Sequence, residues 1–460
     1  MNEDTLVGAV ARELAAEIDP GLVVTSGPGY EDSLRILNGG VTSRPALVVR
    51  ARSAADVRAA VCAAGRHGLP LSVRAGGHDW AGRCLRHDGL VIDLTGLRQV
   101  AVDPRARVAI LGGGATANDV LTAAAPHGLV AATGSVGTVG MVGLTLAGGY
   151  GPLSGRFGLA VDNLLGADLV LADGRMVTAD DEHEPELFWA IRGGGGNFGV
   201  VTSMRVRLHP VDRVLAGLIP YPWEQAADVL GQLGEVLVAA PDELTVESAI
   251  LTGPDGRRGL FVAPVWAGDL DAGQPHLDRL QALGTPARAQ VGPLAYHDVV
   301  HFFDAQGEVA GHHYAARTRS LARLTPDAIA ALVRAGDTVT TPLSSVPISH
   351  FHGAAARVPV ESTSFGLRQE HLMVEMLATW EPGDREPHQA WADSVADALA
   401  AEALPGGYPN VLGPDDQAQA AHAYGPNTER LLAAKSRFDP DGVFSATPLP
   451  VTGTGADDQS

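Results

Sequence analysis

Glycine is concentrated in three short stretches of the first half of the chain. These are Arg74–Gly82 (RAGGHDWAG), Gly134–Gly151 (GSVGTVGMVGLTLAGGYG) and Arg192–Gly199 (RGGGGNFG). Glycine lets consecutive backbone N–H groups turn into a concave anion-binding surface, and it lacks the Cβ that would collide with a pyrophosphate or a planar ring. One such cluster is as readily a tight turn as a binding site, but three in half a chain favour close approach of the backbone to a ligand.

The common nucleotide-binding motifs do not explain these stretches. The sequence contains no GxxxxGK[ST] loop, and GGGATA near Gly112 only loosely matches the dinucleotide fingerprint that opens a helix after a first strand. The glycines therefore predict a binding surface that is neither a P-loop nor a Rossmann domain.

Length and charge limit the class of protein further. The chain has 460 residues, well beyond the roughly 250–300 at which a single hydrophobic core stops growing. Two domains are therefore expected, with room for a large ligand between them. The formal net charge of −20 argues against nucleic acid and against an anionic membrane surface, because both attract clustered Lys and Arg. A small-molecule partner fits better, and the oligomeric state stays open.

Cysteine usage and the N-terminus favour a reducing compartment. Cys62 and Cys84 are the only cysteines, which excludes a disulfide framework, and the helical setting of Cys62 makes even one bridge a poor prediction. The first residues, MNEDTLVGAVARELAAEI, are acidic and amphipathic and lack the features of an export signal. No run approaches the roughly 18 apolar residues of a membrane span. We therefore expect a cytoplasmic protein.

The first half alternates between strand and helix patterns. ALVVRAR and LSVRAGG are strand-like, and between them Ser53 begins a Ser-x-x-Asp capping signature for a helix that contains Val57 and Val61. This pattern predicts a βαβ unit whose second strand ends in a glycine loop. His78 follows those glycines, on a loop where the backbone can approach a ligand.

The second half has longer helical patterns and fewer glycines. Helices are expected near 223–238, 269–282 and 326–335, interleaved with alternating strands such as LTVESAIL and GLFVAPVWAG. A further helix is expected over 427–438. The sequence thus predicts an α+β protein whose second domain is a sheet backed by helices.

Four segments together resemble a known family. They are VRAGGHDWAG followed by VIDLTGL, then GSVGTVGMVGLTLAGGYGPLSGRFGLAVDN, then ELFWAIRGGGGNFGVVTSM. In this order and spacing they resemble the FAD-linked oxidases of the vanillyl-alcohol-oxidase superfamily, in the branch of berberine bridge enzyme-like proteins. The resemblance extends from about residue 44 to about residue 448.

The resemblance implies a two-domain PCMH-type FAD-binding fold. Residues 1–208 would form the FAD-binding domain, and residues 209–404 the substrate-binding domain, an antiparallel sheet backed by helices. Residues 405–448 would return to the FAD-binding domain. Residues 449–460 are expected to form a disordered tail.

The resemblance also implies covalent FAD. His78 occupies the position of the family histidine that is joined to the flavin 8α-methyl carbon, and such a bond raises the flavin reduction potential. Many relatives have a second, cysteinyl link, but Val136 stands at that position, so a single link is expected. Val139 stands beside the oxygen-reactive face of the flavin in relatives, where valine favours an oxidase that uses dioxygen. The other expected FAD-binding residues are Arg74, Ala75, Gly76, Gly77, Asp79, Gly134, Ser135, Gly137, Gly140, Gly143, Leu144, Gly149, Gly151, Val200, Tyr408 and Asn410.

Hydride transfer from an alcohol or amine carbon needs a base for the departing O–H or N–H proton. We expect Glu375 in this role, because it lies in the apolar strand LMVEMLATW at an offset from Trp380 that matches a substrate-contacting Glu or Gln of relatives. The alternative is a glutamate on a solvated strand face. Tyr150 and Tyr408 are expected to orient the substrate, since the second tyrosine of the family Tyr-x-Asn-Tyr motif is replaced here by Val411.

Aromatic and histidine side chains complete the expected substrate pocket. Trp80 takes a place often held by tyrosine in relatives, and it could instead be a core aromatic. His350 and His352 alternate in SHFHG and should share a face, but a third ligand with metal-site spacing is lacking. They are therefore expected to line the substrate pocket, and no metal is expected.

The resulting hypothesis is an FAD-dependent oxidase that removes a hydride from an alcohol, amine or phenol-type small molecule and passes the electrons to dioxygen. Its Ala- and Arg-rich composition suggests a bacterial natural-product tailoring enzyme. Two alternatives stay open: a flavin-dependent dehydrogenase or cyclase that does not use dioxygen, and a non-catalytic flavin- or metabolite-binding protein.

Overall fold

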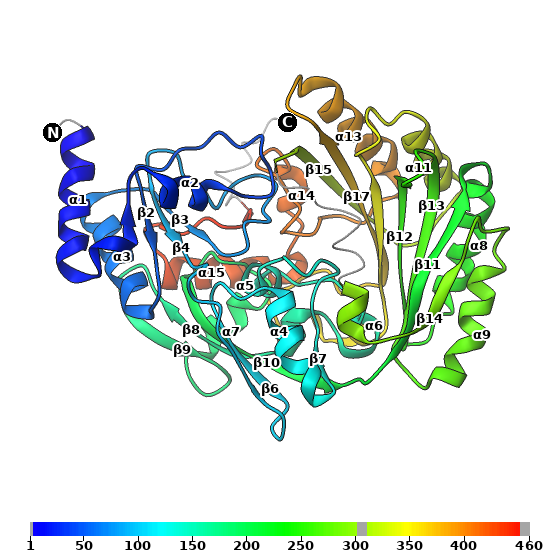
Figure 1. The fold of residues 1–460 in the computed structure, drawn as a ribbon, viewed down its shortest axis with the longest axis horizontal. Helices are drawn as coiled ribbons and strands as arrows, with labels where there is room; N and C mark the ends of the chain where they lie inside the picture. Colours follow the sequence, from blue (N-terminus) through cyan, green and yellow to red (C-terminus); the bar gives the residue numbers. More distant parts are fainter. Residues whose placement is uncertain (1–2, 301–310, 451–460) are drawn as a thin grey trace, which may run out of the picture.

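The computed structural model describes residues 3–300 and 311–450 and contains three β-sheets (Figure 1). The first sheet has the order β1-β2-β4-β3, the second is built on β5-β6-β10-β8-β9 with β7 beside β10, and the third has the order β14-β11-β13-β12-β16-β17-β15. The first two use strands from the first half of the chain and the third uses strands that follow them. The expected α+β class is confirmed.

The first sheet contains the predicted βαβ unit. Strands β2 (Leu47–Arg50) and β3 (Leu71–Arg74) flank helix α3 (Ala54–His67), and β4 (Leu90–Asp93) inserts between them, parallel to both. Ser53 caps α3 as predicted: its hydroxyl accepts from the Asp56 N–H at 3.2 Å, and the Asp56 carboxylate accepts from the Ser53 N–H at 2.8 Å. Strand β1 (Val23–Val24) and helices α1 (Glu3–Glu17) and α2 (Pro28–Leu34) complete this part.

The second sheet is antiparallel and centres on the long strand β10 (Val200–Pro210). Its other strands are β5 (Val100–Asp103), β6 (Val108–Gly112), β7 (Leu129–Ala131), β8 (Leu164–Val170) and β9 (Met176–Ala179). The accompanying helices are α4 (Ala117–Ala124), α5 (Met141–Leu146), α6 (Ser154–Phe157) and α7 (Pro185–Ile191).

The third sheet is antiparallel and is backed by helices on one face. Its strands are β11 (Val214–Pro222), β12 (Leu244–Thr252), β13 (Arg258–Trp266), β14 (Gln290–Leu294), β15 (His313–Leu321), β16 (Val346–Phe351) and β17 (His371–Trp380). Helices α8 (Ala226–Val238), α9 (Leu270–Gln281), α11 (Pro326–Asp337) and α13 (Glu386–Leu399) cover its outer face (Figure 1). The expected helices and strands of this region are confirmed.

Strand β17 shows how the two faces of this sheet differ. Leu372, Val374 and Met376 belong to the core formed with the backing helices, whereas Met373 and Leu377 pack in a separate aromatic cluster on the opposite face. Side chains alternate along a strand, so Glu375 lies on the same face as Met373 and Leu377. We call this the inner face of the third sheet.

The C-terminal part of the chain returns to the first half. Helix α15 (Thr428–Phe438) packs against α7, and it follows the short helices α12 (Ala354–Arg357) and α14 (Gln417–Ala420) along the chain. The disordered tail was expected to begin at residue 449, and this boundary is too early. Leu449 packs against the core of the second sheet, and Pro450 is buried. Residues 451–460 lie outside the described part.

Two further expectations concern cysteines and membranes. Cys62, on α3, and Cys84 are free thiols, as expected. Within the described residues, no helix is both long and apolar enough to cross a lipid bilayer.

Candidate active site

The three glycine-rich stretches meet at α5. A Cβ on Gly76 would lie 2.3 Å from the Gly140 nitrogen, so the first two stretches touch backbone to backbone and tolerate no side chain there. The Gly193 and Gly195 N–H groups of the third stretch both donate to the Leu146 carbonyl, at 2.8 and 2.9 Å. Residues distant in sequence therefore form one glycine-lined region.

The expected FAD-binding residues divide into accessible and buried groups within this region. The accessible or partly accessible ones are Arg74, Ala75, Gly76, His78, Asp79, Ser135, Val136, Val139, Gly143, Leu144 and Asn410. The buried ones are Gly77, Gly134, Gly137, Gly140, Gly149, Gly151, Val200 and Tyr408. Val200 packs in the core with Val170 and Phe444, so its side chain is not accessible to a cofactor.

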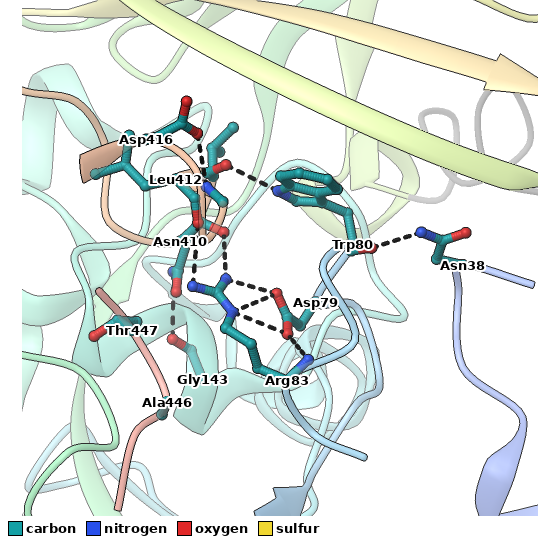
Figure 2. A network of polar contacts seen from close by, with 12 residues as sticks. Asn38, Asp79, Trp80, Arg83, Gly143, Asn410, Leu412, Asp416, Ala446 and Thr447 are labelled. Atoms are coloured by element: carbon teal, nitrogen blue, oxygen red, sulfur yellow. Dashed lines mark hydrogen bonds and ion pairs between the residues drawn. The ribbon is translucent and has the colours of Figure 1, made fainter. Parts of the chain in front are cut away.

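The His78 loop is tied to the C-terminal segment by polar contacts (Figure 2). The Asp79 carboxylate accepts from the Arg83 guanidinium at 2.6 Å, and the same guanidinium donates to the Leu412 carbonyl at 3.1 Å. The Trp80 indole N–H donates to the Val411 carbonyl at 2.8 Å. The ionic contact with Arg83 anchors the Asp79 carboxylate within the loop, and the expected role of Asp79 in FAD binding stays a prediction. Trp80 likewise has a structural contact beside its place against the inner-face cluster.

Tyr150 is fixed by a buried histidine that the sequence analysis did not identify. The His371 Nδ1 donates to the Gln369 carbonyl at 2.7 Å, so its Nε2 is the acceptor in the neutral ring and takes the Tyr150 O–H at 2.9 Å. Burial lowers the pKa of His371 to about 4, so the ring is neutral at pH 7. His371 could have been identified from the sequence, because it lies four residues before Glu375 on an alternating strand and therefore shares its face.

Tyr408 has the opposite hydrogen-bonding arrangement. Its hydroxyl oxygen accepts from the Gly149 N–H at 3.0 Å and from the Asn410 side-chain amide at 2.9 Å. Burial raises the pKa of Tyr408 to about 12, so the phenol keeps its proton at pH 7. The hydroxyl hydrogen has no acceptor among the described residues and can point to a ligand.

Glu375 lies on the inner face of the third sheet, near these tyrosines. It is partly accessible, whereas its neighbours Val374 and Met376 are fully buried against the helices. Its negative charge contributes to the raised pKa values of both Tyr150 and Tyr408, which places the three side chains in one electrostatic neighbourhood. The structure thus brings together the three expected catalytic residues.

A second carboxyl, which the sequence analysis missed, lies on the same face. Glu247 of β12 accepts a hydrogen bond from the Ser349 hydroxyl at 2.7 Å. Burial and the nearby Glu375 raise the pKa of Glu247 to about 7. Glu247 could have been identified from the alternation of LTVESAIL, which puts this acidic residue on the face opposite the apolar positions.

The two predicted pocket histidines, His350 and His352, stack on each other with ring centroids 3.8 Å apart. By the strand register His350 is directly opposite Leu372, which belongs to the helix-backed core, so His350 points away from the inner face. His352 meets Gly155 of α6. The expectation that His350 and His352 line the substrate pocket stays a prediction. In the parts 3–300 and 311–450, no three His, Cys, Asp or Glu side chains gather as metal ligands would.

Comparison with known families identifies two matching regions. Residues 45–180 match the model described as "FAD binding domain", and residues 407–448 match the model described as "Berberine and berberine like". The first region contains the glycine stretches of the His78 loop and of α5, and the second contains Tyr408 and Asn410.

Curated and solved relatives span nearly the whole chain. The FAD-linked oxidoreductase aurO of Gibberella zeae is 33% identical over an alignment of 436 residues, and the match covers 93% of this chain and 84% of that protein. The (R)-6-hydroxynicotine oxidase of Paenarthrobacter nicotinovorans is 32% identical and matches 90% of this chain and 93% of its own length. The crystal structure of 6-hydroxy-D-nicotine oxidase from Arthrobacter nicotinovorans superposes with a TM-score of 0.83 at 29% identity, covering 92% of this chain and 96% of that one.

Proposed function

Because this chain belongs to the FAD-linked oxidoreductases of the berberine-like family, we propose that it is an oxidase with FAD joined covalently to His78. Its substrate would be an alcohol, amine or phenol-type small molecule, and dioxygen would accept the electrons. The resemblance inferred from the sequence motifs is confirmed at the level of the family and of FAD-dependent redox chemistry. A role in natural-product tailoring stays a prediction.

The residues of the glycine-lined region fit FAD. Gly76 and Gly140 pack backbone to backbone, and the flanking Ala75, Ser135, Val136, Val139 and Gly143 are at least partly accessible. A Cβ on Gly143 would meet no atom within 4 Å, so space continues beside α5. The Thr145 hydroxyl is buried without a hydrogen-bond partner among the described residues and could pair with a ligand atom. When bound, FAD supplies the hydride acceptor.

A single covalent link agrees with the two cysteines. Val136 stands where the second link would form. Cys62 lies on α3 against Gly174, remote from the glycine-lined region, and burial raises the pKa of Cys84 to about 12. A thiol of that pKa is a poor nucleophile at neutral pH. His78 is partly accessible on its anchored loop, so it is the proposed attachment residue.

The observation that best supports this function is the gathering of Glu375, Tyr150 and Tyr408 at the inner face of the third sheet. Glu375 would take the O–H or N–H proton of the substrate, and the Tyr408 hydroxyl would donate a hydrogen bond that orients the reacting group. Tyr150 is a poor base, because its proton is committed to His371 and burial raises its pKa well above 10. The aromatic side chains Phe351 and Phe365 pack around Tyr150 and exclude water.

The test is anaerobic mixing of the purified holoenzyme with primary alcohols, amines and phenols, followed by air. The proposal predicts bleaching of the flavin absorbance by at least one donor, and recovery of the colour with release of hydrogen peroxide once air is admitted. Bleaching without recovery would favour the dehydrogenase or cyclase alternative over an oxidase. Absence of bleaching with every donor class would contradict the proposed function as a whole.

A further inference from the structure

Two tyrosines, Tyr150 and Tyr408, lie side by side in the aromatic cluster of the inner face, and we call them the tyrosine pair. Their ring centroids are 4.8 Å apart, and the residues keep only 7% and 6% of their surface exposed. Each phenol hydroxyl has one hydrogen to donate and lone pairs that accept. The partners that the protein supplies therefore decide what each hydroxyl can still offer to a ligand.

The protein occupies the acceptor positions of the Tyr408 oxygen. The Gly149 N–H donates to it at 3.0 Å, and the Asn410 side-chain amide donates at 2.9 Å. The same amide nitrogen lies 3.3 Å from the Gly143 carbonyl oxygen, which can only accept, so this nitrogen is the NH₂ group. Tyr408 is left with its hydrogen, for which the described residues provide no acceptor. Towards a ligand, Tyr408 is therefore a donor.

The Tyr150 hydroxyl has the reverse arrangement, and His371 is the cause. The His371 Nδ1 lies 2.7 Å from the Gln369 carbonyl oxygen and therefore carries the ring hydrogen. Burial lowers the pKa of His371 to about 4, so the ring is neutral at pH 7 and its Nε2 can only accept. This Nε2 lies 2.9 Å from the Tyr150 oxygen and takes the phenol hydrogen. Towards a ligand, Tyr150 is therefore an acceptor.

The packing around His371 holds this arrangement in place. The residue is only 2% exposed, and the Phe351 ring stacks on the imidazole with centroids 4.5 Å apart and planes inclined by 22°. Tyr150 also directly follows Gly149, whose N–H holds the Tyr408 oxygen. Both hydroxyls are thus anchored through adjacent residues of the second glycine-rich stretch, and the contact with His371 fixes one end of this arrangement.

We propose that His371 is a positioning residue that makes Tyr150 a hydrogen-bond acceptor, so that the tyrosine pair presents one acceptor and one donor to the substrate. The inference rests on the proposed function and narrows its substrate class. The reacting group must carry both a hydrogen and a lone pair, as a hydroxyl or an uncharged N–H amine does. An ether, a tertiary amine or a carbonyl group lacks the hydrogen for Tyr150, and an ammonium group lacks the lone pair for Tyr408.

The test measures binding to the intact holoenzyme with probes that cannot transfer a hydride. Phenol and tert-butanol have no hydrogen on the carbon that bears the hydroxyl, and anisole and tert-butyl methyl ether are the matching ethers without the O–H. Each alcohol and its ether are titrated calorimetrically into wild type, Tyr150→Phe, His371→Phe and His371→Gln. Phenylalanine fills the space of the imidazole without an acceptor, whereas the glutamine amide oxygen can still accept from Tyr150. The control is His127→Phe, since His127 is exposed.

The measured quantity is the preference of each protein for an alcohol over its ether. In wild type, in the control and in His371→Gln, at least one alcohol should bind about tenfold or more tightly than its ether, because the ether cannot donate to Tyr150. In Tyr150→Phe and His371→Phe the two affinities should come within about threefold of each other, because Tyr150 is then absent or free to donate to the ether. A purely structural role of His371 would weaken both ligands together and leave the preference unchanged, and a steric effect of the methyl group would be the same in every variant.

The outcomes separate this inference from the function on which it rests. The inference is overturned if wild type binds both ethers as tightly as the alcohols or binds neither alcohol, if the preference survives in Tyr150→Phe or His371→Phe, or if His371→Gln loses it. Should His371→Phe not fold, His371→Leu takes its place with the same expected loss. If a donor bleaches the flavin anaerobically in that case, the proposed oxidase function stands while the role of His371 fails. If no donor bleaches it, the function itself fails.

Discussion

Replacement of Glu375 by glutamine is expected to slow reduction of the flavin by about 10²–10⁴-fold, the usual contribution of a general base. Glutamine keeps the shape of the side chain and cannot accept the substrate proton. The neighbouring phenols do not compensate, because Tyr150 donates to His371 and the pKa of Tyr408 is raised to about 12. The rate is measured by stopped-flow absorbance under anaerobic conditions with a donor that bleaches wild type.

A matched control is Glu370→Gln, since Glu370 is exposed just before β17. That variant should reduce the flavin at the wild-type rate. If Glu375→Gln did so too, the base would have to be another group, and the expected role of Glu375 would be wrong.

Replacement of Asp162 by asparagine is expected to lower the free energy of unfolding by about 3–5 kcal/mol, the cost of leaving one buried charge of an ion pair uncompensated. The Arg368 guanidinium donates hydrogen bonds to both carboxylate oxygens of Asp162, at 2.7 and 3.0 Å. The two side chains are only 5% and 8% exposed. This pair joins the segment after α6 to the segment that leads into β17, so its loss should also loosen the inner face.

Urea denaturation followed by tryptophan fluorescence measures the change. The control is Glu186→Gln, which breaks the exposed pair with Arg430 and should cost less than about 1 kcal/mol. Equal losses of unfolding free energy in the two variants would show that the buried pair stabilises the fold no more than the exposed pair does.

Local sequence patterns predicted the elements that position the site. The alternation of LMVEMLATW fixed Glu375 on a strand, and the Ser53 capping signature marked the start of α3. Both depend on contacts within a few residues, which a single sequence records. The contact of Asp79 with Arg83 was also visible as a four-residue spacing and was overlooked.

Contacts between distant strands could not be predicted in the same way. Glu247 and Glu375 become neighbours only through the register of β12, β16 and β17, and register depends on the whole sheet. The direction of the His350 side chain could not be predicted for a related reason. Strand β16 (VPISHF) has no clean alternation of polar and apolar residues, so its sequence does not show which face is inward.

The most direct test of the covalent flavoprotein is the absorbance spectrum of the purified protein before and after acid precipitation, in wild type and in His78→Ala. We expect the wild-type pellet to keep the yellow flavin and the variant to release it into the supernatant. Flavin that leaves the wild-type protein on precipitation would contradict the attachment at His78, and protein purified without any flavin would contradict the proposed flavoprotein oxidase.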